Sequence, residues 1–119
     1  MVLDSNVIIR YLNAETQVVE KLQEWRSSGH FLLISSLTYA EVLSLSLLTP
    51  KKLKAIQGFL NTFLSIPFDN QIGEMAAYIR RLYRLALPDA GIVATALKHD
   101  VPLVTNDKGL MKVKDVTIV

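Results

Sequence analysis

Four acidic residues of this chain stand where a carboxylate could take part in chemistry. Asp4 and Asp107 each follow a short apolar segment that is typical of a buried strand. Glu41 comes shortly after another such segment, and Asp89 begins a predicted helix that leads into the next strand. Because the carboxyl ends of parallel strands share one edge of an α/β sheet, where ligands bind, we expect the four carboxylates to converge there.

Carboxylates gathered at one place repel one another and raise each other's pKa unless they bind protons or a cation. The chain has no cysteine, and His30 and His99 are its only histidines, so a metal would be held mostly by oxygen. Oxygen ligands suit Mg²⁺ or Mn²⁺. A bound divalent ion activates water and neutralises charge on a phosphate, so the chemistry expected here is phosphodiester hydrolysis.

Each of these acids also has a purely structural interpretation. Asp4 and Asp89 precede predicted helices and could be N-caps. Glu41 stands three residues after Thr38, which is the spacing of a capping box. Asp107 lies in a sequence rich in turn-forming residues. Taken singly, each acid fits a cap or a turn, and only their joint placement favours a functional site.

Hydrophobic periodicity predicts the elements that would position these acids. Short apolar segments predict strands at 1–3, 31–35, 65–68, 101–105 and 116–119. Helical spacing predicts helices over 6–12, 16–26, 39–48, 50–64, 71–86 and 89–99. Strands that alternate with helices are parallel and joined by crossovers. We therefore expect an α/β fold with a single domain, residues 1–119, in which a central parallel sheet is flanked by helices on both faces.

Composition excludes several other classes of protein. A chain without cysteine cannot form a disulfide framework, and its amino terminus lacks the pattern of a signal peptide. The apolar stretch 31–48 is long enough to suggest a membrane span. We interpret it as a strand followed by a helix, because Glu41 would be costly in lipid. We expect a cytoplasmic protein with no membrane association.

The distribution of charge hints at a nucleic acid. The chain has 13 Lys and Arg against 11 Asp and Glu, and without the four pooled acids the ratio becomes 13 to 7. A basic surface around an acidic pocket suits phosphate binding, although an ordinary solvated surface explains the same numbers. Arg80, Arg81 and Arg84 share the polar side of one predicted helix and could follow an RNA backbone, with Tyr78 available for base stacking. A solvated helix face is the alternative.

Four motifs in the chain resemble those of PIN domains, especially the VapC-type toxins of bacterial and archaeal toxin–antitoxin pairs. The motifs are LDSN at 3–6, TYAEV at 38–42, LPDAGIVATA at 87–96 and PLVTND at 102–107. They occur in the order of the family, and the similarity covers almost the whole chain. The third motif is the most specific of the four.

The resemblance implies a site as well as a fold. The residues that would bind the metal and carry out catalysis are Asp4, Glu41, Asp89 and Asp107. Asn6 and Thr105 would orient them. The family cleaves RNA with Mg²⁺ or Mn²⁺, often as a homodimer, and is silenced by a small antitoxin protein. One departure is Gly91, which stands in a helix where a bulkier residue is usual and lowers helix propensity by about 1 kcal/mol.

Three other functions are compatible with parts of this pattern. A PIN-like module could bind RNA or a protein without cleaving, but all four acids are present. A flap-type nuclease acting on DNA would need a long helical arch insertion, and the sequence shows none. A phosphatase of small substrates would need a nucleophilic Asp-x-Asp pair, which is lacking. An RNA endonuclease is the function that we expect.

Overall fold

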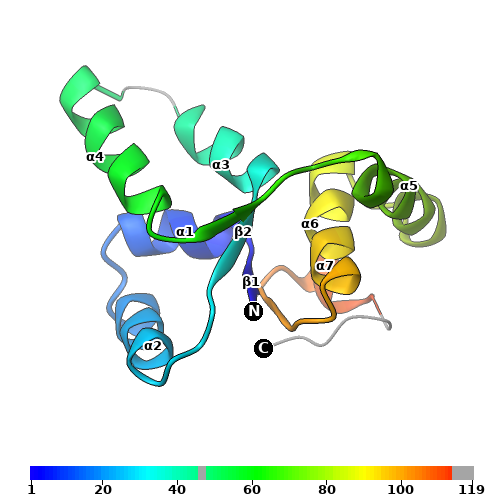
Figure 1. Ribbon diagram of the computed structural model, residues 1–119, viewed down its shortest axis with the longest axis horizontal. Coiled ribbons are helices and arrows are strands. Elements are labelled where there is room, and N and C mark those ends of the chain that lie inside the picture. The colour runs from blue at the N-terminus through cyan, green and yellow to red at the C-terminus, as the bar shows by residue number, and fades with distance from the viewer. Residues whose placement is uncertain (46–47, 114–119) are drawn as a thin grey trace.

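A parallel sheet runs through the middle of the computed structural model, which describes residues 1–45 and 48–113 (Figure 1). Its strands are β1 (Val2–Leu3), β2 (Leu33–Ser35), β3 (Leu64–Ile66) and β4 (Leu103–Val104). The order across the sheet is β3-β2-β1-β4, and Val2 of β1 pairs with Leu33 on one side and Leu103 on the other. The predicted parallel sheet is confirmed. The strand predicted at 116–119 lies outside the described residues.

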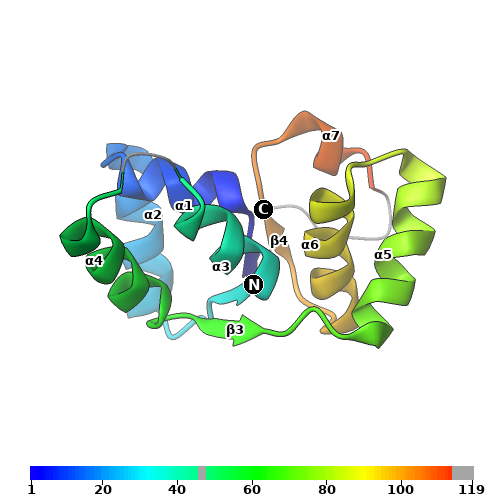
Figure 2. The same cartoon turned by 90° about the horizontal axis from the view of Figure 1, so that it is seen from above.

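Helices connect the strands and lie in two groups, α1 to α4 on one half of the molecule and α5 to α7 on the other (Figures 1 and 2). They are α1 (Ser5–Leu12), α2 (Thr16–Ser27), α3 (Ser36–Leu43), α4 (Pro50–Leu60), α5 (Asn70–Tyr83), α6 (Leu87–Lys98) and α7 (Lys108–Met111). None of these helices is long and apolar enough to cross a membrane. The stretch 31–48 begins instead with β2 and α3, as predicted.

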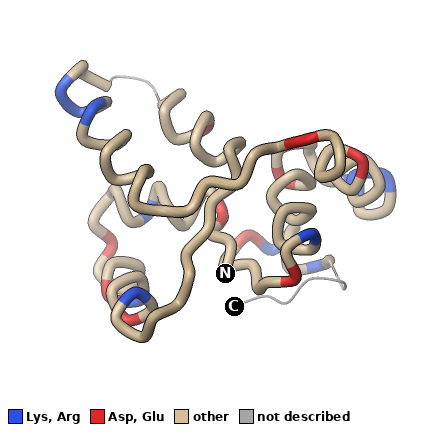
Figure 3. Tube along the Cα trace, in the orientation of Figure 1, with Lys and Arg blue, Asp and Glu red and all other residues tan. Residues whose placement is uncertain are grey.

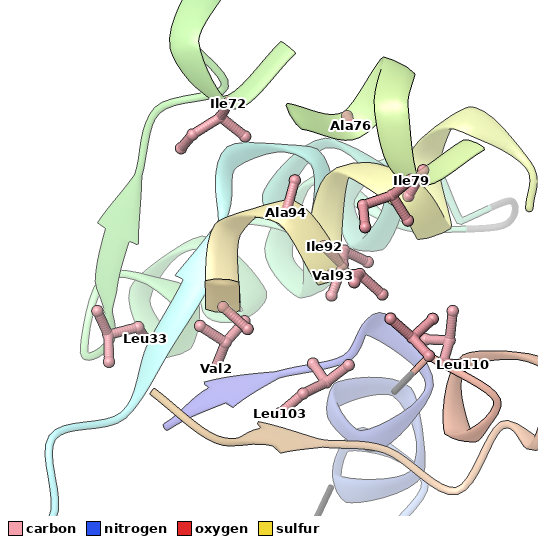
Figure 4. Packing of buried hydrophobic residues seen from close by; sticks show 13 residues of the cluster. Val2, Leu33, Ile72, Ala76, Ile79, Ile92, Val93, Ala94, Leu103 and Leu110 are labelled. Carbon is pink, nitrogen blue, oxygen red and sulfur yellow. The ribbon is translucent and has the colours of Figure 1, made fainter. Parts of the chain in front are cut away.

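Successive residues of each strand point to opposite faces of the sheet, which gives the molecule two hydrophobic cores. One core joins Val2, Leu33 and Leu103 to residues of α5, α6 and α7, including Ile79, Ile92 and Leu110 (Figure 4). The other core joins Leu3, Ile34 and Val104 to residues of the first four helices, including Ile8, Leu22, Val42 and Leu60. Helices therefore cover both faces, as the sequence predicted.

Helix α3 begins earlier than predicted, and the reason is a cap that the sequence analysis overlooked. The Ser35 hydroxyl accepts a hydrogen bond from the Leu37 N–H at 3.1 Å, so Ser35 is the N-cap. Thr38 then lies inside the helix rather than at its start. The capping-box interpretation of Glu41 is wrong, because Thr38 is not the cap.

The turn between α5 and α6 also differs from the prediction. Helix α5 ends at Tyr83 because Arg84 adopts the left-handed conformation, with φ 56° and ψ 38°. Helix α6 already begins at Leu87, and its N-cap position is Ala86. Asp89 is therefore a residue of the first turn, and its interpretation as an N-cap is wrong. Further along, α7 follows the predicted turn at Asp107 as a short helix that was not predicted.

Gly91 lies where α6 comes close to α3 and to the segment after β3. A Cβ atom at this position would overlap Leu37 Cδ1 and would lie 3.0 Å from Phe68 Cε2. Both contacts are to the ends of side chains, Leu37 and Phe68, which are half-buried and would have to shift to make room for a methyl group. Close packing explains the glycine that departs from the family pattern.

We expect Gly91→Ala to lose the stability that alanine normally adds to a helix. Alanine gains about 1 kcal/mol over glycine in a helix interior, but overpacking costs about 1–3 kcal/mol. Gly58→Ala in α4 is the matched control, because a Cβ there meets nothing within 4 Å. Urea unfolding should show Gly58→Ala as more stable than the wild type and Gly91→Ala as no more stable. Equal gains in both variants would contradict the packing argument.

Candidate active site

Asp4 lies at the junction of β1 and α1 and is almost completely buried, with 2% of its surface exposed. Its Oδ2 accepts a hydrogen bond of 2.7 Å from the Thr105 hydroxyl, which stands just after the neighbouring strand β4. Asp4 occupies the N-cap position of α1, but its side chain makes no capping hydrogen bond. The backbone N–H groups of Ser5 and Asn6 lie near the carboxyl group and act to lower its pKa, although neither makes a capping hydrogen bond. The carboxylate is thus held toward β4 rather than used as a cap.

Asp107 is joined to Asp4 through the same threonine. The Asp107 N–H donates to Thr105 Oγ1 at 3.0 Å, while that hydroxyl donates to Asp4. Asp107 Oδ1 accepts from the Gly109 N–H at 2.7 Å, so Asp107 caps α7, whereas the sequence had suggested a turn there. Among the described residues, no hydrogen bond involves its second oxygen, Oδ2. A capping role therefore leaves one Asp107 oxygen available to a ligand.

Glu41 lies on α3, next to a pair of hydroxyl groups that come from different helices. The Ser5 and Thr38 hydroxyls are buried and lie 3.0 Å apart. In this pair the Ser5 hydroxyl donates and the Thr38 hydroxyl accepts. Burial raises the pKa of Glu41, and the nearby Ser5 hydroxyl opposes part of that rise. Sequence reasoning missed both hydroxyls, although each stands inside one of the acidic motifs.

Asp89 is half-buried in the first turn of α6. An acidic side chain at this place interacts favourably with the positive end of the helix dipole. Within 1–45 and 48–113, no protein donor makes a hydrogen bond to its carboxylate. Asp89 is therefore the acid of the four whose carboxylate is least engaged by other protein groups.

The four acids act on one another electrostatically. Burial raises the pKa of Asp4, and the charge of Asp107 raises it further. Glu41 is an exposed residue as a whole, yet partial burial of its carboxyl group raises its pKa, as do the charges of Asp89 and Asp4. Burial likewise raises the pKa of Asp89, followed by the charges of Asp4 and Asp107. Asp4, Glu41 and Asp89 thus each lie near enough to other acids of this set for the charges of those acids to raise their pKa.

This acidic edge lies on one side of the molecule. The junction of β1 and α1, the turn into α6 and helix α7 all face the upper side of Figure 2. In the described part of the chain, the ion pairs are Arg10–Glu15 and Lys21–Glu24, and neither involves the four acids. No protein cation in that part of the chain therefore balances the charge of the cluster directly.

The donor set suits a hard cation, but not one enclosed by the protein. Of the residues described, no three His, Asp or Glu side chains are placed so that they could hold a metal ion among them. Asp4 and Asp107 each have one oxygen bonded to a protein donor. Mg²⁺ usually keeps several waters and takes one or two carboxylates directly. The arrangement therefore fits a hydrated ion that contacts some of the acids through water.

The other residues predicted for the site have different surroundings. Thr105 makes the orienting contact that was expected of it. Asn6 is exposed on α1, and in the described chain its side chain makes no hydrogen bond. Arg80, Arg81 and Arg84 lie exposed at the end of α5.

The fold and the acidic edge together define a small parallel α/β domain with a carboxylate site at the end of its central strands. Residues 1–116 match the PIN domain, and the chain belongs to this family. The resemblance seen in the four motifs is confirmed. A comparison with curated proteins finds no match.

Several solved structures share this fold over almost the whole chain. A toxin–antitoxin complex from Klebsiella pneumoniae has a chain with 27% identity and a TM-score of 0.85, covering 99% of this chain and 94% of that one. FitAcB from Neisseria gonorrhoeae gives 29% identity and a TM-score of 0.79, with coverage of 98% and 94%. VapBC2 from Rickettsia felis, bound to a DNA fragment from its promoter, is 19% identical with a TM-score of 0.84 and coverage of 99% and 96%, a likeness of fold alone.

Proposed function

We propose that this chain is a metal-dependent RNA endonuclease and the toxin of a VapC-type toxin–antitoxin pair. The observation that carries the proposal is a group of four acids in a PIN domain, in which burial and the charges of neighbouring acids raise the pKa of Asp4, Glu41 and Asp89. Such a group is unfavourable for the folded protein unless it binds a cation. Mg²⁺ or Mn²⁺ would relieve this repulsion and supply the electrophile for phosphodiester hydrolysis.

In this proposal the four acids have different surroundings and therefore different roles in metal binding and catalysis. Asp4 is held in one orientation by Thr105, which suits a carboxylate that anchors the ion. Asp89 and the Asp107 Oδ2 supply further oxygens at the same edge. Glu41 has a raised pKa from burial and from its acidic neighbours, so its carboxylate is a stronger base than an ordinary glutamate. It is suited to accept a proton from the attacking water.

The similar structures support the partners that we propose. The Klebsiella chain belongs to a toxin–antitoxin complex and covers this chain almost completely. FitAcB, at 29% identity, has the same fold. We therefore assign a small antitoxin protein as the inhibitory partner, and we retain the expectation of a homodimer that acts in the cytoplasm.

A cleavage assay tests the proposed activity. The purified chain should cut a 5′-labelled single-stranded RNA in Mg²⁺ or Mn²⁺ and should leave it intact in excess EDTA. A DNA oligonucleotide of the same sequence should survive in both conditions. Cleavage that persists in EDTA would overturn the metal-dependent mechanism. Metal-independent RNA binding without any cleavage would instead favour a non-catalytic PIN module.

Thr105 provides a narrower prediction about the same site. Thr105→Val keeps the shape of the side chain but removes the donor to Asp4 and the acceptor of the Asp107 N–H. Since this hydrogen bond lowers the pKa of Asp4, its loss should raise that pKa further. Loss of an orienting partner typically lowers activity about 10–100-fold. Cleavage by Thr105→Val, measured from pH 5 to 9, should be slower and should reach its maximum at a higher pH. Thr105→Ser keeps the hydroxyl and should behave like the wild type. Equal behaviour of the two variants would contradict the orienting role of Thr105.

A further inference from the structure

Two buried hydroxyl groups connect the helix that follows Asp4 with the helix that carries Glu41. Ser5 comes directly after Asp4 and is the first residue of α1, and Thr38 stands three residues before Glu41 on α3. The Ser5 hydroxyl donates to Thr38 Oγ1 at 3.0 Å, and the two residues are only 4% and 0% exposed. The contact therefore fixes α1 and α3 to each other close to two of the four acids.

The bond between the two helices differs from the one that a buried threonine usually makes in a helix. Ser and Thr side chains in helices commonly bond a carbonyl of the preceding turn. Thr95 on α6 does so, since its hydroxyl donates to the Gly91 carbonyl at 2.8 Å, and it is as fully buried as Thr38. In the part of the chain that the structure describes, the Thr38 hydroxyl bonds Ser5 instead. Thr38 is thus directed to α1 rather than to its own helix.

Stability alone gives no reason for a hydroxyl pair at this place. Ile8 of α1 and Val42 of α3 are buried in the same apolar core, so apolar side chains suit the contact between these helices. Burying a hydroxyl costs free energy that its hydrogen bond roughly offsets. Replacing both partners with apolar groups of the same shape can be nearly neutral or even stabilising. The reason for the pair therefore has to be sought in the neighbouring acids.

Glu41 has a hydroxyl beside it but no cation on its own helix. Its neighbours on α3 are all uncharged, and Figure 3 shows no basic position along this helix. Neither ion pair of the described residues involves Glu41. The Ser5 hydroxyl lies near enough to the Glu41 carboxyl to oppose the rise of its pKa. Because a hydroxyl can accept one hydrogen bond while it donates another, reversal of the bond to Thr38 would turn the Ser5 proton toward Glu41.

We propose that Ser5 and Thr38 are positioning residues of the acidic site, in which Thr38 fixes the Ser5 hydroxyl and Ser5 fixes the Glu41 carboxylate relative to Asp4. The inference rests on the proposed nuclease function, which assigns proton transfer to Glu41. Neither hydroxyl touches the reacting atoms. Thr38 acts only through Ser5, so the effects of losing the two hydroxyls should not add.

The test uses apolar variants that keep the size of each side chain. Cleavage of a 5′-labelled RNA in Mn²⁺ should be about 10–100-fold slower in Ser5→Ala and in Thr38→Val, as is typical when an orienting partner is lost. The loss should be in kcat, with KM little changed, because neither hydroxyl binds the substrate. Thr38→Ser keeps the hydroxyl and should cleave like the wild type. Thr95→Val is the matched control, since it removes an equally buried hydroxyl that bonds its own helix, and it should keep full activity.

The double variant Ser5→Ala/Thr38→Val separates positioning from packing. It should cleave no more slowly than Ser5→Ala alone, because Thr38 has no effect once Ser5 has lost its hydroxyl. Its Tm without metal should stay close to that of the wild type, since both polar partners are gone. Losses of kcat that multiply in the double variant would overturn the proposal, as would equal losses in Thr38→Ser and Thr38→Val. Ser5→Ala removes a single oxygen atom, so its kcat and KM decide the matter if Thr38→Val does not fold.

The positioning role and the nuclease function fail in different ways. An active wild type whose Ser5→Ala variant cleaves equally fast would support the nuclease and contradict the positioning role. A wild type that cleaves no RNA would contradict the nuclease, and the rise of Tm with Mn²⁺ would then test the hydroxyl pair. That rise should be smaller in Ser5→Ala and Thr38→Val than in Thr95→Val, because a carboxylate that is not held in place binds the ion less well. Equal rises in the three variants would overturn the positioning role.

Discussion

Asp89→Asn is expected to lower RNA cleavage by at least about 100-fold while leaving the protein folded. The substitution keeps the size of the side chain and removes the negative charge that a cation would bind. Loss of a group that acts on the reacting atoms typically costs 10²- to 10⁴-fold. Single-turnover cleavage of labelled RNA in Mn²⁺ measures the effect, and Asp4→Asn should produce a loss of the same order.

Asp69→Asn is the matched control for this experiment. Asp69 is a true N-cap, since its Oδ1 accepts from the Ile72 N–H at 2.9 Å at the start of α5. Asn caps a helix as well as Asp does, so this variant should keep full activity and stability. If Asp89→Asn cleaved RNA as fast as Asp69→Asn, Asp89 would be a first-turn acid with no part in the chemistry.

The stability of Asp89→Asn gives a second readout. Burial and neighbouring charges raise the pKa of Asp89 in the folded protein above its ordinary value of 3.8. The folded state therefore holds this proton to higher pH than the unfolded state does, and the stability that the protonated group contributes is lost as pH rises through the folded pKa. The asparagine side chain carries no titrating proton, so the variant does not lose this stability as pH rises. Without metal it should be at least as stable as the wild type at pH 8. That advantage should disappear below about pH 4.

Much of this fold could be predicted because its signals are local. The stripe of Ile72, Ala76 and Ile79 marks α5 in the sequence and packs into the core as expected. The expected meeting of the acids at one sheet edge follows from β1 and β4, which end before Asp4 and Asp107, combined with a general property of parallel sheets. Neither inference required knowledge of any particular side-chain contact.

The errors fall where the outcome depends on backbone details or on residues distant in sequence. Both Ser35 and Thr38 could cap α3, and their sequence alone does not distinguish them. The hydroxyl pair beside Glu41 joins residues 33 positions apart, which no periodicity reveals. The left-handed conformation of Arg84, which ends α5, is one that the sequence around it does not favour.

Mn²⁺ is expected to stabilise the metal-free protein strongly at pH 8 and weakly at pH 5. A ligand present at 100 times its Kd adds about 2.7 kcal/mol to the folded state. For a domain of this size each kcal/mol moves the Tm by about 4 °C, so the rise should be roughly 10 °C. Carboxylates must lose their protons to bind a metal. Because burial and mutual repulsion raise the pKa of Asp4, Glu41 and Asp89, protons compete with the ion in the lower pH range.

Glu41→Gln locates the ion within the acidic edge. Ser35 caps α3, so Glu41 does not form a capping box. A smaller rise in Tm with Mn²⁺ in this variant would therefore be due to loss of the Glu41 carboxylate. Glu20→Gln on the exposed side of α2 removes the same charge away from the edge and should leave the shift unchanged. A full shift in Glu41→Gln would remove Glu41 from the ion's surroundings and leave Asp4, Asp89 and Asp107. No shift in the wild type at either pH would overturn the metal site itself, since four acids that repel one another should bind a divalent cation most readily where they carry full charge.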